Sequence, residues 1–127
     1  MGGIFHKKRH AHLILGKRGE NIASRYLRIK GMKVLLRNYR NNYGEIDIIA
    51  LDGDCLCFVE VKTRRTSSCN RPVDGFRYAQ QCRVKKAAIS YINKLNLSGF
   101  IYRFDLIEII IGRFDIKELR YWQNFIY

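Results

Sequence analysis

Three acidic residues and a lysine stand in two consecutive segments that otherwise have the composition of buried strands. Asp47 lies among isoleucines in the stretch 45–51, and Glu60 and Lys62 lie among valines in the stretch 55–63. A charged side chain that leaves water is costly unless it is paired or binds an ion. Carboxylates beside an amine are also the groups that metal-dependent hydrolysis of phosphodiesters requires.

The hairpin that joins these segments predicts which side chains share a face. Asp52-Gly53 is the strongest short turn signal in the sequence, and a two-residue turn there places Asp47 opposite Phe58. Opposed and alternate residues share a face. One face then carries Glu45, Asp47, Glu60 and Lys62, continued by Ile49, Leu56 and Phe58. The other face carries Ile46, Ile48, Ala50, Cys55, Cys57, Val59 and Val61. The apolar pattern therefore favours a register that clusters the acids.

Clustered carboxylates repel one another unless a cation lies among them. Hard oxygen ligands of this type suit Mg²⁺ or Mn²⁺. Lys62 lies roughly 6.6 Å beyond Glu60 on the same face, where its amine could position a water or help to deprotonate it. These residues predict a metal-dependent nuclease face. The alternative is a structural ion-pair cluster. Glu45 is expected to be a rim charge or a partner of the metal ligands, in preference to a direct ligand.

A fourth carboxylate comes from a helix predicted over residues 16–30. Glu20 shares one stripe of this helix with Gly16, Ala23 and Leu27. An acid on an inward stripe is costly unless it is paired. We therefore expect Glu20 to reach the metal from above the sheet.

The remaining elements follow from apolar periodicity and turn residues. Strands are predicted at 33–39, 45–51, 55–63 and 101–111, with a basic loop at 64–74, a second helix at about 75–95 and an aromatic-rich ending at 113–127. The second helix is expected to turn Tyr78, Cys82, Ala88, Ile89 and Ile92 inward. This order predicts an α/β sandwich with a mixed sheet, in which residues 1–12 form a basic N-terminal arm and residues 13–127 a single domain.

The charge of the chain predicts a polyanionic partner. The formal net charge is +13, with net +10 over residues 1–40, −4 over 41–62 and +7 over 63–94. Two basic segments thus flank an acidic centre, which favours nucleic acid over an anionic membrane. The candidate phosphate contacts are Lys7, Lys8, Arg9, Lys17, Arg18, Arg37, Arg40, Arg64, Arg65 and Arg71. Elsewhere, Arg103 and Asp105 are expected to pair with each other.

Membrane and zinc sites are not expected. No apolar run approaches the ~18–20 residues of a transmembrane helix, and the N-terminus lacks the apolar core of a signal peptide. We therefore expect a cytoplasmic protein with no membrane partner, in which the four cysteines are reduced. Cys55 and Cys57 share an apolar face, so core packing is favoured over metal binding.

Four stretches resemble the YraN family. They are GKRGE at 16–20, RNYRNNYGEIDIIALDG at 37–53, FVEVKTR at 58–64 and YRFDLI at 102–107. This family of small bacterial proteins is assigned to the PD-(D/E)xK nuclease superfamily, and the layout is also similar to that of archaeal Holliday junction resolvases. The resemblance implies a restriction-endonuclease-like α-β-β-β-α-β core with a central mixed sheet flanked by helices.

The resemblance also implies roles for single residues. By position, Glu20 matches the acid of the first helix and Asp47 the acid of the strand, while Glu60 and Lys62 match the ExK pair. The backbone carbonyl of Val61 is implied as a further metal contact. The family pattern places a lysine near position 80, where this chain has Gln80-Gln81.

These observations predict a Mg²⁺- or Mn²⁺-dependent endonuclease that acts on nucleic acid, with DNA favoured over RNA and branched or recombination intermediates as conceivable substrates. The alternative is a non-catalytic nucleic-acid-binding accessory protein that retains the nuclease fold. A weaker third hypothesis is a ribosome-associated basic protein. A homodimer would suit cleavage of both strands, although no residue pattern indicates one.

Overall fold

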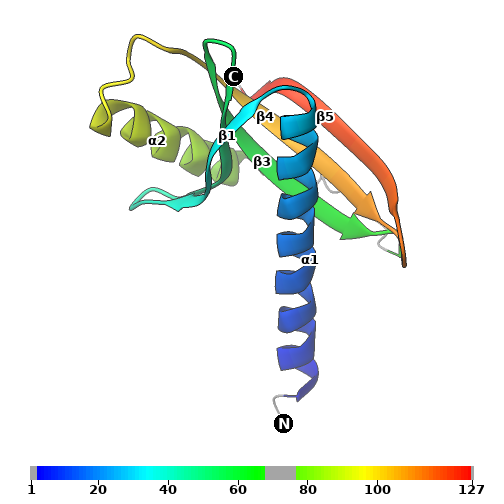
Figure 1. The fold of residues 1–127 in the computed structure, drawn as a ribbon. Coiled ribbons are helices and arrows are strands. Elements are labelled where there is room, and N and C mark those ends of the chain that lie inside the picture. The colour runs from blue at the N-terminus through cyan, green and yellow to red at the C-terminus, as the bar shows by residue number, and fades with distance from the viewer. Residues whose placement is uncertain (1–2, 68–76, 127) are drawn as a thin grey trace.

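The computed structural model describes residues 3–67 and 77–126 (Figure 1). In chain order these residues form α1 (Gly3–Ile29), β1 (Lys33–Arg40), β2 (Glu45–Asp52), β3 (Cys55–Arg65), α2 (Tyr78–Lys94), β4 (Ile101–Ile111) and β5 (Ile116–Ile126). The predicted α-β-β-β-α-β order and the mixed sheet are confirmed. The strand β5 follows this core and adds a fifth strand to the sheet.

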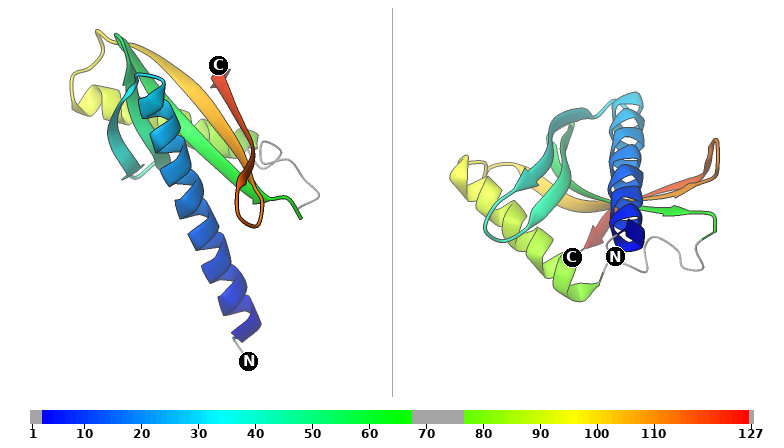
Figure 2. Two further views of the ribbon diagram at one scale, coloured as in Figure 1. Left: turned by 45° about the vertical axis from the view of Figure 1, so that its right-hand side comes forward. Right: turned by 90° about the horizontal axis from the view of Figure 1, so that it is seen from below.

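The strands form one sheet in the order β1-β2-β3-β4-β5. β3 and β4 are parallel, whereas the other neighbouring strands are antiparallel. The parallel pair requires a crossover, and α2 lies within it. The two helices lie on opposite faces of the sheet (Figure 2), which gives three layers.

Each helix covers its own apolar cluster. The α2 side contains Ile46, Ile49, Leu56, Phe58, Val84, Ala87, Ala88, Tyr91, Ile92, Phe104 and Leu106, with Tyr39 packed against them. The α1 side contains Leu15, Ala23, Leu27, Met32, Ile48, Ala50, Cys57, Val59, Ile107, Ile109 and Ile111. The central strands are therefore buried on both faces, as expected for a sheet between two helical layers.

The β2–β3 turn differs from the prediction by one residue. Asp52 pairs with Cys55, so the turn is Gly53-Asp54, and Gly53 adopts a φ of 58° that favours glycine. Relative to the predicted pairing, the register moves by two residues, which is one full side-chain period. The faces therefore stay as predicted, except that Ile46 packs on the α2 side.

The aromatic-rich ending was predicted without a strand, but it forms β5 along the edge of β4. Alternation in its sequence is broken because the β4–β5 register shifts at two places, and Asn124 has a φ of 55°. Each bulge changes which face the following side chains occupy. Leu119 and Tyr121 accordingly pack on the α1 side, whereas Trp122 and Phe125 pack on the α2 side.

The first helix was predicted to begin at Gly16 but begins at Gly3. Residues 3–12 of the predicted basic arm therefore continue α1, and this half of the helix extends beyond the sheet (Figure 1). Gly16 is a weak helix former inside this helix. Leu15 is buried against the sheet, however, so packing maintains the helix across that glycine.

The inward face of α2 was partly mispredicted. Ala88 and Ile92 are buried, but Tyr78 is 81% exposed and Ile89 is 46% exposed. The buried stripe also includes Val84, Ala87 and Tyr91, which follow the spacing of one helical face. Tyr78 lies in the first turn of the helix, before the stripe reaches the sheet.

Candidate active site

Asp47 and Glu60 form a carboxyl pair in which Glu60 is buried and Asp47 is half-buried. Asp47 is on β2 and Glu60 is on the neighbouring β3, where only 5% of Glu60 is exposed. The two carboxyl groups lie close enough for each to change the pKa of the other. Burial is the main cause that raises the pKa of both groups, and the Asp47 charge raises that of Glu60 further. The pair therefore takes up a proton readily in the absence of another cation.

Lys62 and Gln80 complete the polar contacts of Glu60. Gln80 comes from the first turn of α2, and its Nε2 donates to Glu60 Oε1 at 3.2 Å. Its Oε1 accepts from Lys62 Nζ at 3.0 Å, and Lys62 Nζ lies 3.7 Å from Glu60 Oε1. Glu60 Oε2 is buried and accepts no hydrogen bond from the N–H and O–H groups of the described residues. One oxygen of this acid thus remains available to a proton or a cation.

Gln80 is a site residue that the sequence did not assign. The family pattern predicts a lysine near position 80, where this chain has a glutamine. Its amide contacts both partners of the ExK pair, the carboxylate by its N–H and the ammonium by its oxygen. The family pattern therefore predicts that position 80 lies at the site, but it does not predict that a glutamine there contacts both Glu60 and Lys62.

Glu20 approaches Asp47 from α1. Gly19 lies against Thr63 of β3, where the Cβ of any larger residue would overlap the threonine side chain, so α1 comes close to the sheet directly before Glu20. Burial is the main cause that raises the pKa of Glu20, and the charge of Asp47 raises it further. A hydrogen bond from Asn38 acts in the opposite direction.

Two cavities meet at Asp47. An open cleft of about 730 Å³ lies toward α1, and its lining includes Lys17, Glu20, Arg37, Arg40, Glu45 and Asp47. A smaller cavity of about 260 Å³ lies toward α2 and is lined by Gly44, Glu45, Asp47, Glu60, Gln80, Arg83 and Val84. Asp47 and Glu45 line both cavities. Glu20 and Glu60 therefore face Asp47 from different sides.

The three predicted acids are not equally close to one another. Asp47 and Glu60 are in direct contact, whereas Glu20 interacts with Asp47 through its charge. Within residues 3–67 and 77–126, no group of three or more His, Cys, Asp or Glu side chains is close enough to hold a metal ion. The compact part of the site is therefore the Asp47–Glu60 pair with Lys62 and Gln80.

The backbone of Val61 also faces this site. Its N–H donates to Asp47 Oδ2 at 2.8 Å, instead of to a carbonyl of β2. In a strand, the N–H and C=O of one residue point to the same side. The Val61 carbonyl, which the resemblance implies as a metal contact, therefore points from β3 toward β2 and Asp47.

The predicted basic residues occupy different places. Lys17, Arg37 and Arg40 line the larger cleft. Arg37 donates to Asn21 Oδ1 at 2.7 Å, and Arg40 pairs with the exposed Glu45 at 3.1 Å, which agrees with a rim position for that acid. Among the others, Lys7 and Arg65 are exposed, Arg18 is half-buried, and half-buried Arg64 donates to the Thr63 carbonyl. The side chains of Lys8, Arg9 and Arg71 lie outside the described part of the chain. Arg83, which was not predicted, lines the smaller cavity.

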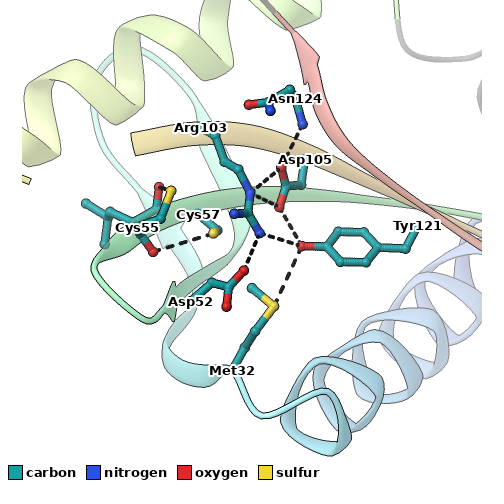
Figure 3. A network of polar contacts seen from close by, with 9 residues as sticks. Met32, Asp52, Cys55, Cys57, Arg103, Asp105, Tyr121 and Asn124 are labelled. Carbon is teal, nitrogen blue, oxygen red and sulfur yellow. Dashed lines mark hydrogen bonds and ion pairs between the residues drawn. The ribbon is translucent and has the colours of Figure 1, made fainter. Parts of the chain in front are cut away.

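A second polar network lies on the α1 side of the sheet, among Asp52, Arg103, Asp105, Tyr121 and the Asn124 backbone (Figure 3). The predicted pairing of Arg103 with Asp105 is confirmed, with Nε 3.0 Å from Oδ2. Arg103 also binds Asp52 at 2.9 Å and Tyr121 at 3.2 Å. This network fixes β4 to β5 and to the end of β2.

The described cysteines have no metal-binding arrangement. Cys55, Cys57 and Cys82 are free thiols, and Cys69 lies outside the described residues. Burial raises the pKa of Cys57, which keeps it protonated and unreactive. The core-packing interpretation of Cys57 is therefore confirmed.

Neither α1 nor α2 contains a stretch apolar enough over sufficient length to cross a lipid bilayer, as far as the described residues extend.

The comparisons with known proteins agree with the resemblance found in the sequence. The family model described as "Uncharacterised protein family UPF0102" matches residues 19–109. The UPF0102 protein of Alkaliphilus metalliredigens is 42% identical over 110 residues, covering 87% of this chain and 95% of that protein. The corresponding protein of Chlorobaculum parvum is 40% identical over 114 residues, covering 90% and 88%. The chain belongs to the UPF0102 family, which is the YraN family that its sequence resembles.

Proposed function

We propose that this protein is a metal-dependent nuclease that hydrolyses phosphodiester bonds in DNA. The observation that carries the proposal is the carboxyl pair of Asp47 and buried Glu60 beside Lys62, at the junction of two cavities. Two acids held this closely repel each other, and a bound cation relieves that repulsion. Basic residues at the cleft could bind the adjacent phosphates.

The residues present fit a hard divalent ion. Asp47 and Glu60 offer carboxylate oxygens, and Glu60 Oε2 has no hydrogen-bond donor among the described residues. The Val61 carbonyl is a third oxygen directed to the same edge, and Glu20 would contribute from the larger cleft. Mg²⁺ or Mn²⁺ bound there would supply Lewis-acid activation of the phosphate and of water.

The chain's own residues would orient the reactants. Lys62 Nζ is held by Gln80 close to Glu60, so its ammonium could hold a water or stabilise charge on a phosphate oxygen. Arg83 lines the same small cavity and could bind a non-bridging oxygen. Lys17 and Arg40 in the larger cleft would contact neighbouring phosphates and set the position of the strand.

The proposal is tested by incubating the purified protein with Mg²⁺ or Mn²⁺ and labelled linear, nicked, flapped and four-way DNA, with RNA as a parallel substrate. Cleavage is expected for the wild type. Asp47→Asn and Lys62→Ala should reduce the rate by at least about a hundredfold while DNA binding in EDTA persists, as expected when groups that act in the transition state are removed. Absence of cleavage on every substrate with both metals would contradict a nuclease function.

A second candidate is a non-catalytic nucleic-acid-binding protein that retains the fold. The observation in its favour is that the described residues contain no preassembled group of three metal-binding side chains. Such a protein should bind DNA with salt-sensitive affinity, and Mg²⁺ should change neither the binding nor the melting temperature. Stabilisation by Mg²⁺ that depends on Asp47 would exclude this candidate.

A further inference from the structure

The β4–β5 hairpin ends in an exposed aromatic residue. Phe114 is 85% exposed and lies in the four-residue connection between Ile111 and Ile116. The connection is closed by a hydrogen bond of 2.8 Å from Gly112 N–H to the Asp115 carbonyl. The tip is therefore an ordered turn that holds an aromatic ring in solvent.

The surroundings of this ring are basic. The guanidinium of Arg113 lies over the Phe114 ring at 5.3 Å from its centroid. The end of β3 runs beside the hairpin, because Arg65 is the register partner of Ile111 and Thr66 N–H donates to the Ile111 carbonyl at 3.1 Å. Asp115, the acid of the tip, is paired with Lys117 at 3.3 Å. An exposed ring among arginines suits a polyanion that carries planar groups.

The tip lies beyond the end of β3, the strand that carries Glu60 and Lys62 of the candidate site. Lys62 precedes Arg65 by three residues on the same strand, which corresponds to about 10 Å. Phe114 lies three residues beyond Ile111, the register partner of Arg65, so its distance from Lys62 is larger than this. A nucleic acid bound at the site and directed along β3 would present a base to Phe114.

We propose that the tip formed by Arg113 and Phe114 is an aromatic wedge that stacks on an unpaired base, with Arg113 and Arg65 on the flanking phosphates. Apolar or aromatic side chains inserted at a base step are a general means of recognising distorted nucleic acid, because the free face of an unpaired base stacks at little cost. The inference rests on the proposed function and adds a substrate class to it, namely nucleic acid with locally unpaired bases.

The test measures binding in EDTA, so that no cleavage occurs. Two DNA duplexes are compared by fluorescence anisotropy, one fully paired and one with a single unpaired 2-aminopurine. Phe114→Ala should lower the affinity for the second duplex by about fivefold or more, leave the first unchanged and abolish quenching of the 2-aminopurine. Phe114→Trp should retain selectivity and quenching. The matched control is Ile116→Ala, since Ile116 is 47% exposed on the same hairpin and should have no effect.

The outcomes separate this inference from the nuclease proposal. If Phe114→Ala retains the wild-type preference for the unpaired base, or loses affinity equally for both duplexes, the wedge is refuted even where the wild type cleaves DNA. If the preference depends on Phe114 but no substrate is cleaved with Mg²⁺ or Mn²⁺, the wedge stands and the nuclease proposal fails.

Discussion

Glu60 is the residue whose environment has the clearest consequence for stability. Its pKa is raised by burial and by Asp47, so the native state holds a proton that the unfolded chain releases at a pKa of about 4.3. Stability should therefore fall as the pH rises from that value through the raised native pKa. Below about pH 4 both states are protonated, and this contribution vanishes.

Glu60→Gln should remove this pH dependence. At neutral pH and without metal, the neutral amide is expected to stabilise the fold by about 1–3 kcal/mol, since an unsatisfied buried acceptor is replaced by a group that can also donate to Asp47. The free energy of unfolding is measured with urea at pH 4 and pH 7.5. Asp54→Asn, at an exposed turn carboxylate, is the control. A loss of stability at pH 7.5 would argue against an unsatisfied buried carboxylate at Glu60.

Gln80 allows a second test at this scale. Its amide orients Glu60 and Lys62, and removal of such a supporting contact typically costs 10–100-fold in metal affinity or activity. Gln80→Ala should show a loss of this size in cleavage rate with Mn²⁺ at unchanged melting temperature. Asn93→Ala, on the exposed part of the same helix, should behave as the wild type. Equal rates for both variants would leave Gln80 without a role in the site.

At the scale of elements, the network around Asp105 should determine whether β5 stays attached. Asp105 is fully buried, and Arg103 is its charged partner. Arg103→Ala leaves an uncompensated buried charge and should destabilise the protein by about 3–5 kcal/mol. Tyr121→Phe removes the hydroxyl that donates to Asp105 and accepts from Arg103, and it should cost about 1.5–3 kcal/mol. Urea unfolding measures both, and the two variants should keep wild-type cleavage per folded molecule.

The elements also show what the sequence could predict. Strand alternation in β2 and β3 placed Asp47, Glu60 and Lys62 correctly, because a register error of two residues returns every side chain to its face. The strand β5 was missed because its bulges interrupt the alternation on which the prediction depends. The beginning of α1 was missed because tertiary packing of Leu15 outweighs the low helix propensity of Gly16.

Only the part of the candidate site that lies on the neighbouring strands β2 and β3 could be predicted. Glu60 and Asp47 are brought together by the hairpin, which the sequence encodes locally. Gln80 and Arg83 reach the site through the placement of α2, and Glu20 through the close approach of α1 at Gly19. Contacts between the helices and the sheet depend on packing distances, which the periodicity of apolar residues does not specify. The two cavities on either side of Asp47 could therefore not be predicted.

At the scale of the whole molecule, the net charge of +13 predicts DNA binding that weakens steeply with salt. Lys17 lines the larger cleft, so Lys17→Gln should weaken binding to all sequences and reduce the slope of log affinity against log salt by about 1. Lys33→Gln, at the exposed start of β1, removes an equal charge away from the cleft and should change the slope little. Identical slopes for both variants would show that the cleft does not contact phosphate.

The most direct measurement for the whole account is calorimetric titration of Mn²⁺ into the wild type and Asp47→Asn. If the carboxyl pair holds a divalent ion, the wild type should bind Mn²⁺ with proton release, since the ion displaces the proton that the raised pKa of Glu60 favours. Asp47→Asn should show little or no binding. Absence of binding to the wild type, or equal binding by the variant, would contradict a metal site at Asp47 and Glu60.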